Sequence, residues 1–272
     1  MKIGGCESKS MISNFFNSCL ALLLIPILVI FLVIGPSLPA YAVQTFTKDE
    51  IPFGIPYEGW FKDYWNWWIN HSQDEINKAK EGGCLMNASS SIVMVIENAH
   101  GKFADQNCNV NASQGIMLPL WIGWCDSSES PPVAKEKLAD CALARYNIGD
   151  IRSEVKVDGK SVANLHAIVD GIPADPNFGV NYKPILLDNV TEVHTKPFIL
   201  KWPGPDKTFK PGADHAGNLN AGAQGWLAFL KPLPRGDHTV TYNVVVECTK
   251  SINSPDCIPV PPTENTYHFH VQ

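Results

Sequence analysis

The chain has 272 residues, of which 45% are hydrophobic and 18% are charged. These proportions are typical of a globular protein and exclude an intrinsically disordered one. The 21 Lys and Arg residues against 27 Asp and Glu residues give a net charge of -6, which argues against nucleic acid as a partner, because phosphate binding needs clustered basic side chains.

The N-terminal segment has the layout of a secretory signal. Residues 19–34 are uncharged and almost entirely aliphatic, with two lysines before them and Ala40-Tyr41-Ala42 after them. A basic start, an apolar middle and a final Ala-x-Ala predict a signal peptide over 1–42. The apolar run is slightly long for a signal, so the alternative is an uncleaved membrane anchor. In either case we expect 43–272 to form a single β-rich extracytoplasmic domain, secreted or anchored to the outer face of the cell membrane.

Aromatic residues dominate the first predicted helix. At 100° per residue, these aromatic side chains fall within one arc of the helix surface. The arc contains Trp60, Phe61, Tyr64, Trp67 and Trp68. Trp65 and Ile69 widen it. Such a face indicates a helix that packs on a sheet, and the alternatives are a membrane-interface helix or a helix that stacks on sugars. Ser72 and Glu75 then have capping-box spacing and predict a second short helix, which Gly82-Gly83 would end.

From residue 91 onward the chain is mainly β. The apolar runs 91–97 and 115–124 predict buried strands, with Pro119 at an edge or bulge. Residues 133–146 suit a short helix over a sheet edge. The alternating stretch 154–160 runs into an Asp-Gly turn, which predicts a hairpin.

The remaining chain alternates between turn-rich stretches and short strands. Residues 171–222 are rich in Pro, Gly, Asn and Asp and predict a long loop region in which a functional loop could lie. We expect strands at 225–230, 238–247 and 266–271. The pattern as a whole predicts a mainly β fold, a disulfide-braced β-sandwich with two or three short α-helices.

Six of the eight cysteines follow the signal, and an even number in an oxidising compartment favours three disulfides. The cysteines cluster in pairs along the chain, so we expect sequential bridges: Cys84–Cys108, Cys125–Cys141 and Cys248–Cys257. Asn-x-Ser/Thr sequons also make the chain a candidate glycoprotein. They begin at Asn70, Asn87, Asn111 and Asn189.

One pattern suggests a metal site. His268 and His270 alternate along a predicted strand, so both imidazoles should point to one face. With His215 as a third ligand, or with His166 and His194, they could hold copper or zinc. Two histidines on a solvent-facing strand need no metal, however, and we expect no cofactor.

Catalytic motifs are missing from the sequence. It contains no G-x-S-x-G elbow, no H-E-x-x-H, no P-loop and no G-x-G-x-x-G. His238 follows Gly236-Asp237 at the start of a predicted strand, where a structural hydrogen bond to the turn is the favoured interpretation. The sequence therefore leaves the question of an enzyme open and favours a protein without catalytic activity.

Three stretches resemble a family of secreted prokaryotic proteins of unknown function. Tyr64-Trp65-Asn66-Trp67 is similar to the W-W-x-W helix of that family, and 224–240 is similar to its G-Y-W-L-x-L-x-P-L-x-P-G-x-H-T-I block. The family also has a cysteine block, C-x-V-P-x-G-K followed by a proline and a cysteine. This chain matches the block except at its first Pro, its Gly and its Lys. The matching residues are Cys84, Cys108, Pro119 and Cys125. The resemblance does not cover 166–222; it implies a secreted β-rich fold and no activity.

Together these features predict a secreted or surface-tethered, non-catalytic binding or structural module. We expect its partner to be a surface ligand, either a carbohydrate or another surface protein, with no nucleic acid and with membrane contact only through the N-terminal segment. The first alternative is an extracellular carbohydrate-active enzyme or carbohydrate-binding protein. The second is a histidine-based copper- or zinc-binding protein.

Overall fold

The computed structural model describes residues 42–87, 91–95, 105–128, 132–144, 149–170, 181–203, 217–247 and 260–272. The chain divides into two units, Met1–Ala42 and Val43–Gln272, and every described helix and strand lies in the second. All of the predicted signal or anchor except its last residue lies outside the described residues. Within the described ranges, no helix combines the length and the apolar composition needed to cross a membrane.

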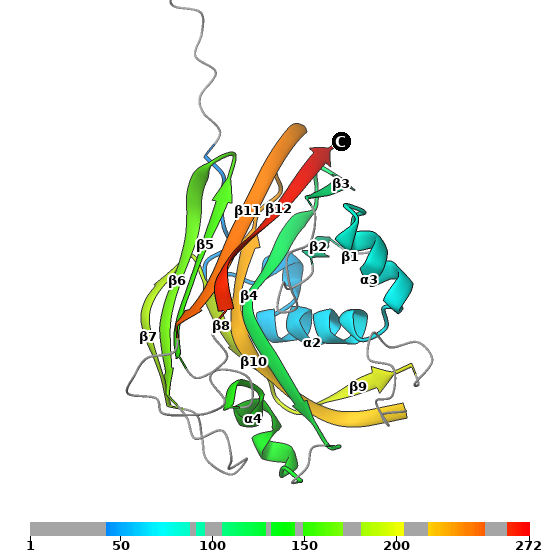
Figure 1. Ribbon diagram of the computed structural model, residues 1–272, viewed down its shortest axis with the longest axis vertical. Coiled ribbons are helices and arrows are strands. Elements are labelled where there is room, and N and C mark those ends of the chain that lie inside the picture. Colours follow the sequence, from blue (N-terminus) through cyan, green and yellow to red (C-terminus); the bar gives the residue numbers. More distant parts are fainter. Residues whose placement is uncertain are drawn as a thin grey trace, which may run out of the picture. The chain divides into compact units, whose positions relative to one another are not determined.

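Two six-stranded sheets make up most of the described chain (Figure 1). The first sheet has the order β1-β2-β4-β10-β8, with β9 also paired to β10; its strands are β1 (Met86–Asn87), β2 (Ile92–Val95), β4 (Gly115–Asp126), β8 (Thr191–His194), β9 (Phe198–Trp202) and β10 (Gly217–Leu230). The second sheet has the order β3-β12-β11-β5-β6-β7; its strands are β3 (Gln106–Val110), β5 (Gly149–Val157), β6 (Lys160–Asp170), β7 (Asn181–Asp188), β11 (Gly236–Glu247) and β12 (Val260–Val271).

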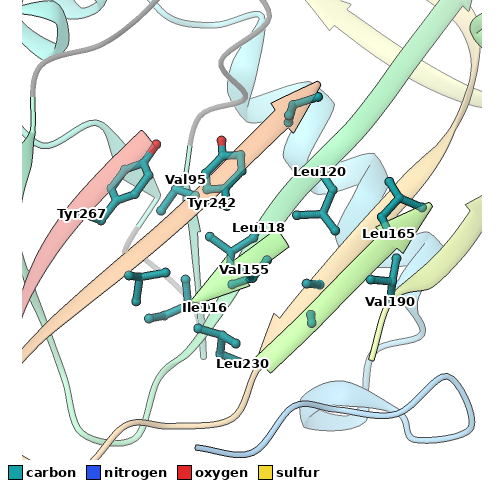
Figure 2. Close-up of a cluster of buried hydrophobic side chains, with 14 of the residues drawn as sticks. Val95, Ile116, Leu118, Leu120, Val155, Leu165, Val190, Leu230, Tyr242 and Tyr267 are labelled. Atoms are coloured by element: carbon teal, nitrogen blue, oxygen red, sulfur yellow. The ribbon is translucent and has the colours of Figure 1, made fainter. Parts of the chain in front are cut away.

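The main hydrophobic core lies between the two sheets. Successive side chains of a strand point to opposite faces, so alternate residues enter this core. Figure 2 shows Ile116, Leu118 and Leu120 of β4 close to Val155 of β5 and Leu165 of β6. All five side chains are at most 2% exposed. The predicted β-sandwich is therefore confirmed.

Helices cover the other face of the first sheet, so its central strand β4 is buried on both sides. While Leu118 faces the sandwich core, Met117 and Ile122 pack with the residues of α2 (Tyr57–Trp68). Burial on both faces explains why 115–124 is a continuous apolar run instead of an alternating one. The register between β4 and β10 shifts next to Pro119, as expected of a proline at a bulge.

The aromatic helix α2 packs on the first sheet, as predicted. Trp65 is 1% exposed, and its ring centroid lies 4.5 Å from that of Trp124 on β4. The sequence pattern put Trp67 within the buried arc and Trp65 at its margin, whereas Trp67 is only half-buried. The reason is the approach of the helix, which brings Trp65 against β4. The buried residues of α2 are Tyr57, Trp60, Phe61, Tyr64, Trp65 and Trp68.

The second helix, α3 (Gln73–Lys80), begins at the predicted capping box. The backbone N–H of Glu75 donates to Ser72 Oγ at 3.3 Å, and the Glu75 carboxylate accepts from the backbone N–H of Ser72 at 2.8 Å. The helix ends before Gly82, whose φ of 95° lies in the left-handed region that glycine tolerates. Both ends of this helix therefore follow the local sequence.

Two regions differ from the sequence predictions. The third helix, α4 (Leu138–Ala144), is shorter than predicted and follows a 3-10 turn, η2 (Lys135–Lys137); another such turn, η1 (Pro52–Gly54), precedes α2. Residues 171–222 are not one loop region, because β7, β8, β9 and the start of β10 lie there. Two parts of that stretch, 171–180 and 204–216, lie outside the described residues.

A close backbone contact explains why the start of β10 lacks a strand pattern. A Cβ atom on Gly222 would lie 2.2 Å from the backbone nitrogen of Ala139 in α4. Only glycine allows the helix to approach the strand this closely. This contact accounts for the glycine at 222, a residue type that does not predict a strand.

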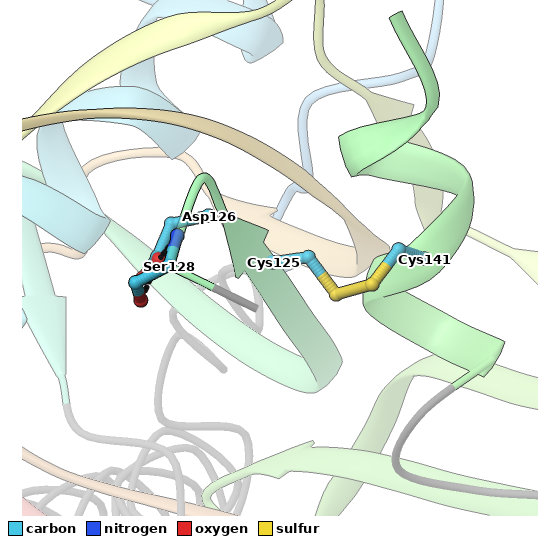
Figure 3. Close-up of a disulfide and its surroundings, with 4 residues drawn as sticks. All are labelled: Cys125, Asp126, Ser128 and Cys141. Atoms are coloured by element: carbon cyan, nitrogen blue, oxygen red, sulfur yellow. Dashed lines mark hydrogen bonds between the residues drawn. A yellow bond between two sulfur atoms is a disulfide. The ribbon is translucent and has the colours of Figure 1, made fainter. Parts of the chain in front are cut away.

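Two of the three predicted disulfides are confirmed, with Cα–Cα distances of 5.2 and 5.9 Å; they are Cys84–Cys108 and Cys125–Cys141. The first joins the segment before β1 to β3, and the second joins the end of β4 to α4 (Figure 3). Beside the second bridge, Asp126 accepts hydrogen bonds from the backbone N–H and the hydroxyl of Ser128. The predicted third pair, Cys248 and Cys257, lies outside the described residues. Disulfides are compatible with an extracytoplasmic location.

Asn265 of β12 is a polar residue inside the sandwich, and it leads to a stability prediction. Its side chain is 2% exposed, and within the described chain neither Nδ2 nor Oδ1 has a hydrogen-bond partner. An unsatisfied buried polar group costs about 1–3 kcal/mol. We therefore expect Asn265→Leu to raise the free energy of unfolding, measured by urea titration, by about 1–2 kcal/mol.

The matched control for this prediction is Asn243→Leu on the neighbouring strand. Asn243 Oδ1 accepts a hydrogen bond from the backbone N–H of Glu154 at 2.7 Å, so its replacement is expected to lower the free energy of unfolding. If Asn265→Leu is destabilising as well, the side-chain amide of Asn265 must have hydrogen-bond partners in solution.

Candidate functional site

A hollow of about 400 Å³ lies on the outer face of the second sheet. It is lined by three adjacent strands, β3, β12 and β11. Cys108, Phe269 and Val240 point from these strands into the core and are buried. Strand alternation therefore leaves the intervening polar side chains on the outer face, without a role in packing. We call the following six residues the polar hollow: Asn107, Asn109, His268, His270, Asp237 and Thr239.

The register of the strands arranges these side chains in two rows. One row contains Asn107, His268 and Thr239, and the other contains Asn109, His270 and Asp237. In the second row, His270 Nδ1 lies 2.6 Å from Asp237 Oδ1, which is a close hydrogen bond. In the first row, His268 Nδ1 lies 3.4 Å from Thr239 Oγ1. His268 is thus held more loosely than His270.

Next to the polar hollow, His238 has the structural role that the sequence predicted. Its Nδ1 lies 2.8 Å from Asp158 Oδ2 in the β5–β6 turn, and its Nε2 lies 3.0 Å from the carbonyl oxygen of Pro234. The Asp158 carboxylate also accepts a hydrogen bond from the backbone N–H of Thr239 at 2.9 Å. These contacts fasten the hairpin turn to the start of β11, the strand that carries Asp237.

The structure brings together two of the three predicted metal ligands. His268 and His270 both lie on the outer face of β12, and His215 lies outside the described residues. His166 and His194 each pair with an aspartate elsewhere, at 3.0 and 2.8 Å. In the part of the chain that the structure describes, no three His, Cys, Asp or Glu side chains are preassembled to hold a metal ion.

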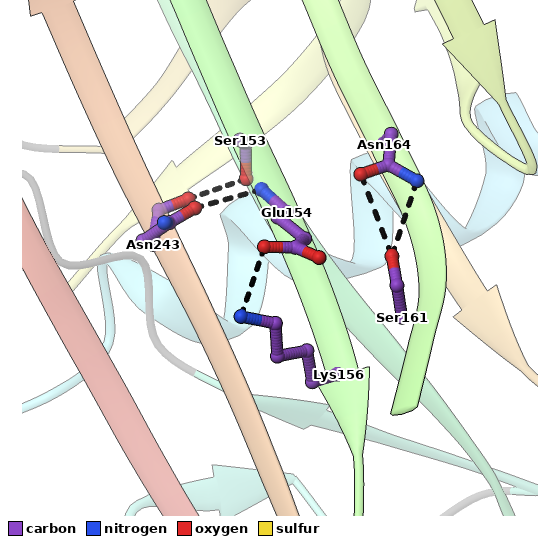
Figure 4. A network of polar contacts seen from close by, with 6 residues as sticks. All are labelled: Ser153, Glu154, Lys156, Ser161, Asn164 and Asn243. Carbon is purple, nitrogen blue, oxygen red and sulfur yellow. Dashed lines mark hydrogen bonds and ion pairs between the residues drawn. The ribbon is translucent and has the colours of Figure 1, made fainter. Parts of the chain in front are cut away.

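Beyond the polar hollow, the outer face of the second sheet is a network of polar contacts (Figure 4). Lys156 Nζ lies 3.0 Å from the Glu154 carboxylate, and Asn164 Nδ2 donates to Ser161 Oγ at 3.2 Å. These side chains satisfy one another. By contrast, the side chains of Asn107 and Asn109 have no hydrogen-bond partner within the described ranges, so their amides remain available to a ligand.

The same face also carries an ionised aspartate, Asp150, whose contacts are structural. Asp150 contacts Arg152 at 2.9 Å and His166 at 3.0 Å. Burial raises the pKa of Asp150, but the hydrogen bonds from Arg152 and His166 outweigh that effect and lower the pKa below its usual value. This cluster is an ion-pair network in which every member has a partner.

None of the eight tryptophans is exposed. All of them lie in the described residues; six are buried, and Trp67 and Trp124 are half-buried. Helix α2 therefore has no exposed tryptophan that could stack on a sugar or enter a membrane interface. A carbohydrate ligand would find no exposed tryptophan to stack on.

The four sequons lie in different settings. Asn111 is exposed in the β3–β4 turn, and Asn87 is half-buried in β1. Asn70 Nδ2 donates to the backbone of α2 at 2.5 Å, and Asn189 Nδ2 donates to the carbonyl oxygen of Val162 at 3.0 Å. A glycan on either of these last two nitrogens would disturb a hydrogen bond, so Asn111 is the sequon best placed for modification.

No protein-family model matches the sequence, and a search of the curated proteins gives no match. The chemistry of the polar hollow therefore has to be interpreted from its own side chains.

Sequence reasoning identified the two histidines of the polar hollow and missed its other four residues. Asn107 and Asn109 enter through the parallel pairing of β3 with β12, which are far apart in the sequence. The polar–apolar alternation of 106–110 around Cys108 was the one available signal, and it does not name a partner strand. Asp237 and Thr239 flank His238, for which the sequence predicted a hydrogen bond to the turn. Their position on the outer face of the sheet was not predicted.

Proposed function

We propose that the protein is a secreted or surface-tethered, non-catalytic binding module whose ligand docks in the polar hollow. The observation that carries this proposal is the placement of six polar side chains from three adjacent strands around one depression of about 400 Å³. Strands of a packed sheet hold the backbone of these residues in place, so a ligand that meets them would lose free energy only to ordering of the side chains.

The chemistry of the polar hollow favours a neutral ligand with many hydroxyl groups. Asn107 and Asn109 offer amide donors and acceptors, and Thr239 offers a hydroxyl. None of the described Lys or Arg side chains lines the hollow, which argues against an anionic ligand there. Carbohydrate binding, through hydrogen bonds and without stacking on tryptophan, is therefore the ligand class that we favour.

Features of the sequence support the extracytoplasmic part of the proposal. The signal layout of 1–42 and the two disulfides both fit an oxidising compartment. The three sequence blocks support membership in the family of secreted proteins that they resemble. N-terminal sequencing of exported protein is the direct test: a start at Val43 supports cleavage, and an intact Met1 supports an anchor.

NMR titration of the exported protein with a panel of soluble oligosaccharides tests the binding function. We expect shifts at backbone amides of β3, β11 and β12. The double variant Asn107→Ala/Asn109→Ala should lower affinity about tenfold, because each lost hydrogen bond is worth about 0.5–1.5 kcal/mol. Asn218→Ala, which removes an exposed asparagine from β10, is the matched control and should leave affinity unchanged.

Two outcomes of this titration would contradict the proposal. Shifts that map to another surface would place the ligand elsewhere, and undiminished affinity in the double variant would remove the polar hollow from recognition. If no oligosaccharide in the panel binds, carbohydrate is wrong as the ligand class.

A further inference from the structure

A short loop near the start of the domain exposes three large apolar side chains. Residues 51–56, which we call the apolar loop, have the sequence Ile-Pro-Phe-Gly-Ile-Pro and contain the 3-10 turn η1. Ile51 is 61% exposed, and Phe53 and Ile55 are each 37% exposed. Single exposed apolar side chains are common on protein surfaces, whereas three within five residues indicate a binding surface.

Hydrogen bonds hold the apolar loop in this exposed conformation. The indole N–H of Trp60 donates to the carbonyl oxygen of Pro52 at 3.0 Å, and the backbone N–H of Ile55 donates to the same oxygen at 3.1 Å. In the turn, Phe53 has a φ of 51° and Gly54 a φ of 78°. Few residues other than glycine adopt the left-handed conformation of Phe53. The fold therefore fixes a turn whose apolar side chains remain in solvent.

Packing against the domain fixes the inner side of the apolar loop. The ring centroid of Phe53 lies 5.4 Å from that of Phe46. A Cβ atom on Gly59 would lie 2.7 Å from Cγ2 of Ile55, so glycine at this position makes room for Ile55 at the start of α2. The parts of Phe53 and Ile55 that remain exposed, together with Ile51, are available to a partner.

The apolar loop lies beside the residues at which the domain begins. The carbonyl oxygen of Gln44 accepts a hydrogen bond from the backbone N–H of Lys231 at 2.8 Å, and the backbone N–H of Phe46 donates to the carbonyl oxygen of Phe229 at 2.8 Å. These bonds fasten the first residues of the domain to the end of β10. The ring contact between Phe46 and Phe53 joins the same residues to the apolar loop.

The predicted signal or anchor places this end of the domain near lipid. Its uncharged apolar run covers 19–34, and the domain begins at Val43. The eight residues between them span at most about 26–29 Å when fully extended. A chain that keeps the apolar run in the bilayer, as an uncleaved anchor does, therefore holds Val43 near the lipid surface.

The charges around the apolar loop favour a hydrophobic contact over an electrostatic one. Lys48 and Asp49 are both exposed and carry opposite charges, and Glu50 pairs with Lys231 at 2.7 Å. This surface is therefore close to neutral and has no cluster of basic side chains for anionic headgroups. Apolar side chains bind at the boundary between headgroups and acyl chains through the area that they bury. An uncharged bilayer surface is thus a sufficient partner.

We propose that the apolar loop inserts into the outer surface of the cell membrane and orients the domain on it. Ile51, Phe53 and Ile55 enter the boundary between headgroups and acyl chains, while α2 stays packed on the first sheet. The inference goes beyond the proposed function, because the apolar loop shares no residue with the polar hollow. It adds a second membrane contact to the one predicted through the N-terminal segment.

Quenching by brominated lipid tests this inference on the exported protein, whichever N-terminus it carries. Ile51→Trp adds an exposed tryptophan to a protein whose native tryptophans are all buried or half-buried. Vesicles of brominated phosphatidylcholine should quench the added emission, because bromine quenches only at close range. The matched control is Ile199→Trp, at another exposed isoleucine, which lies on β9 near Asn66 at the far end of α2. Its added emission should not be quenched.

Flotation with phosphatidylcholine vesicles measures the strength of the contact for protein that begins at Val43. Ile51→Ser/Ile55→Ser should lower the partition coefficient about tenfold or more, because two apolar side chains leave the contact. Raising the salt concentration should have no effect on the native protein. Ile185→Ser/Leu186→Ser, which removes two exposed apolar side chains from β7, is the matched control and should leave partition unchanged. Circular dichroism checks that each variant is folded.

Three results would overturn the inference. Lipid could fail to quench Ile51→Trp, it could quench Ile199→Trp equally, or the apolar-loop double variant could partition as strongly as the native protein. Self-association that this double variant abolishes, without quenching by lipid, would assign the apolar loop to a second copy of the chain instead of the membrane.

The oligosaccharide titration separates this inference from the proposed function. Ile51→Ser/Ile55→Ser should keep oligosaccharide affinity, and Asn107→Ala/Asn109→Ala should keep the contact with lipid. Lipid contact without oligosaccharide binding would keep the membrane surface and remove the carbohydrate ligand. Oligosaccharide binding without lipid contact would keep the binding function and remove the membrane surface.

Discussion

Replacing Trp65 with alanine is expected to lower the free energy of unfolding by about 3–5 kcal/mol. The side chain is 1% exposed, and it contacts Phe61, Tyr64 and Trp124 between α2 and the first sheet. Truncation removes the transfer free energy of the ring and leaves a cavity that the surrounding sheet cannot fill. Urea unfolding followed by far-ultraviolet circular dichroism measures the loss.

Trp67→Ala in the same helix is the control, because Trp67 is half-buried. We expect a smaller loss of about 1–2 kcal/mol, in proportion to the area that it buries. The comparison separates the two interpretations of an aromatic helix. If Trp65→Ala kept full stability, α2 would not be a core helix. The alternative interpretation, a surface role for its aromatic face, would then be favoured.

Removing the Cys84–Cys108 disulfide, with Cys84→Ala/Cys108→Ala, is expected to lower the free energy of unfolding by about 3–4 kcal/mol. The bridge spans 24 residues and so restricts a sizeable loop of the unfolded chain. Cys108 also lies between Asn107 and Asn109 on β3. Among the described strands, β3 pairs only with β12. The variant should therefore weaken ligand binding at the polar hollow as well.

Thermal unfolding and the oligosaccharide titration measure the two effects of this variant. Cys125→Ala/Cys141→Ala is the control, because its 16-residue separation predicts a similar loss of about 3 kcal/mol, while α4 lies away from β3 and ligand affinity should be kept. Equal loss of affinity in the two variants would show that the effect on binding is a general result of instability.

Much of the fold could be predicted from local sequence. The Ser72 capping box, the Asp158-Gly159 turn and the apolar run of β4 each depend on residues that are neighbours in the chain, so each pattern was visible without coordinates. The strands within 171–222 could not be predicted in the same way. β7, β8 and β9 lie at sheet margins. At the start of β10, Gly222 allows the close contact with α4 and does not favour a strand.

The candidate site, too, could be predicted only in part from the sequence. His268 and His270 were visible as an alternating pair, whereas Asp237, Asn107 and Asn109 came next to them only through strand pairing. Antiparallel pairing sets Asp237 opposite His270, and parallel pairing brings β3 beside β12. Such a register follows from which faces the core buries, and a shift of one residue would send every side chain to the other face.

By itself, the sequence determined the mainly β composition, the short helices, both ends of α3 and the sequential disulfides that the structure describes, because periodicity, caps and short loops act between nearby residues. Only the tertiary structure decided which strands are neighbours, that Trp65 rather than Trp67 is buried, and that two asparagines, two histidines, an aspartate and a threonine share one hollow. Those outcomes depend on how two sheets and a helix bury their apolar faces against one another, which no local pattern contains.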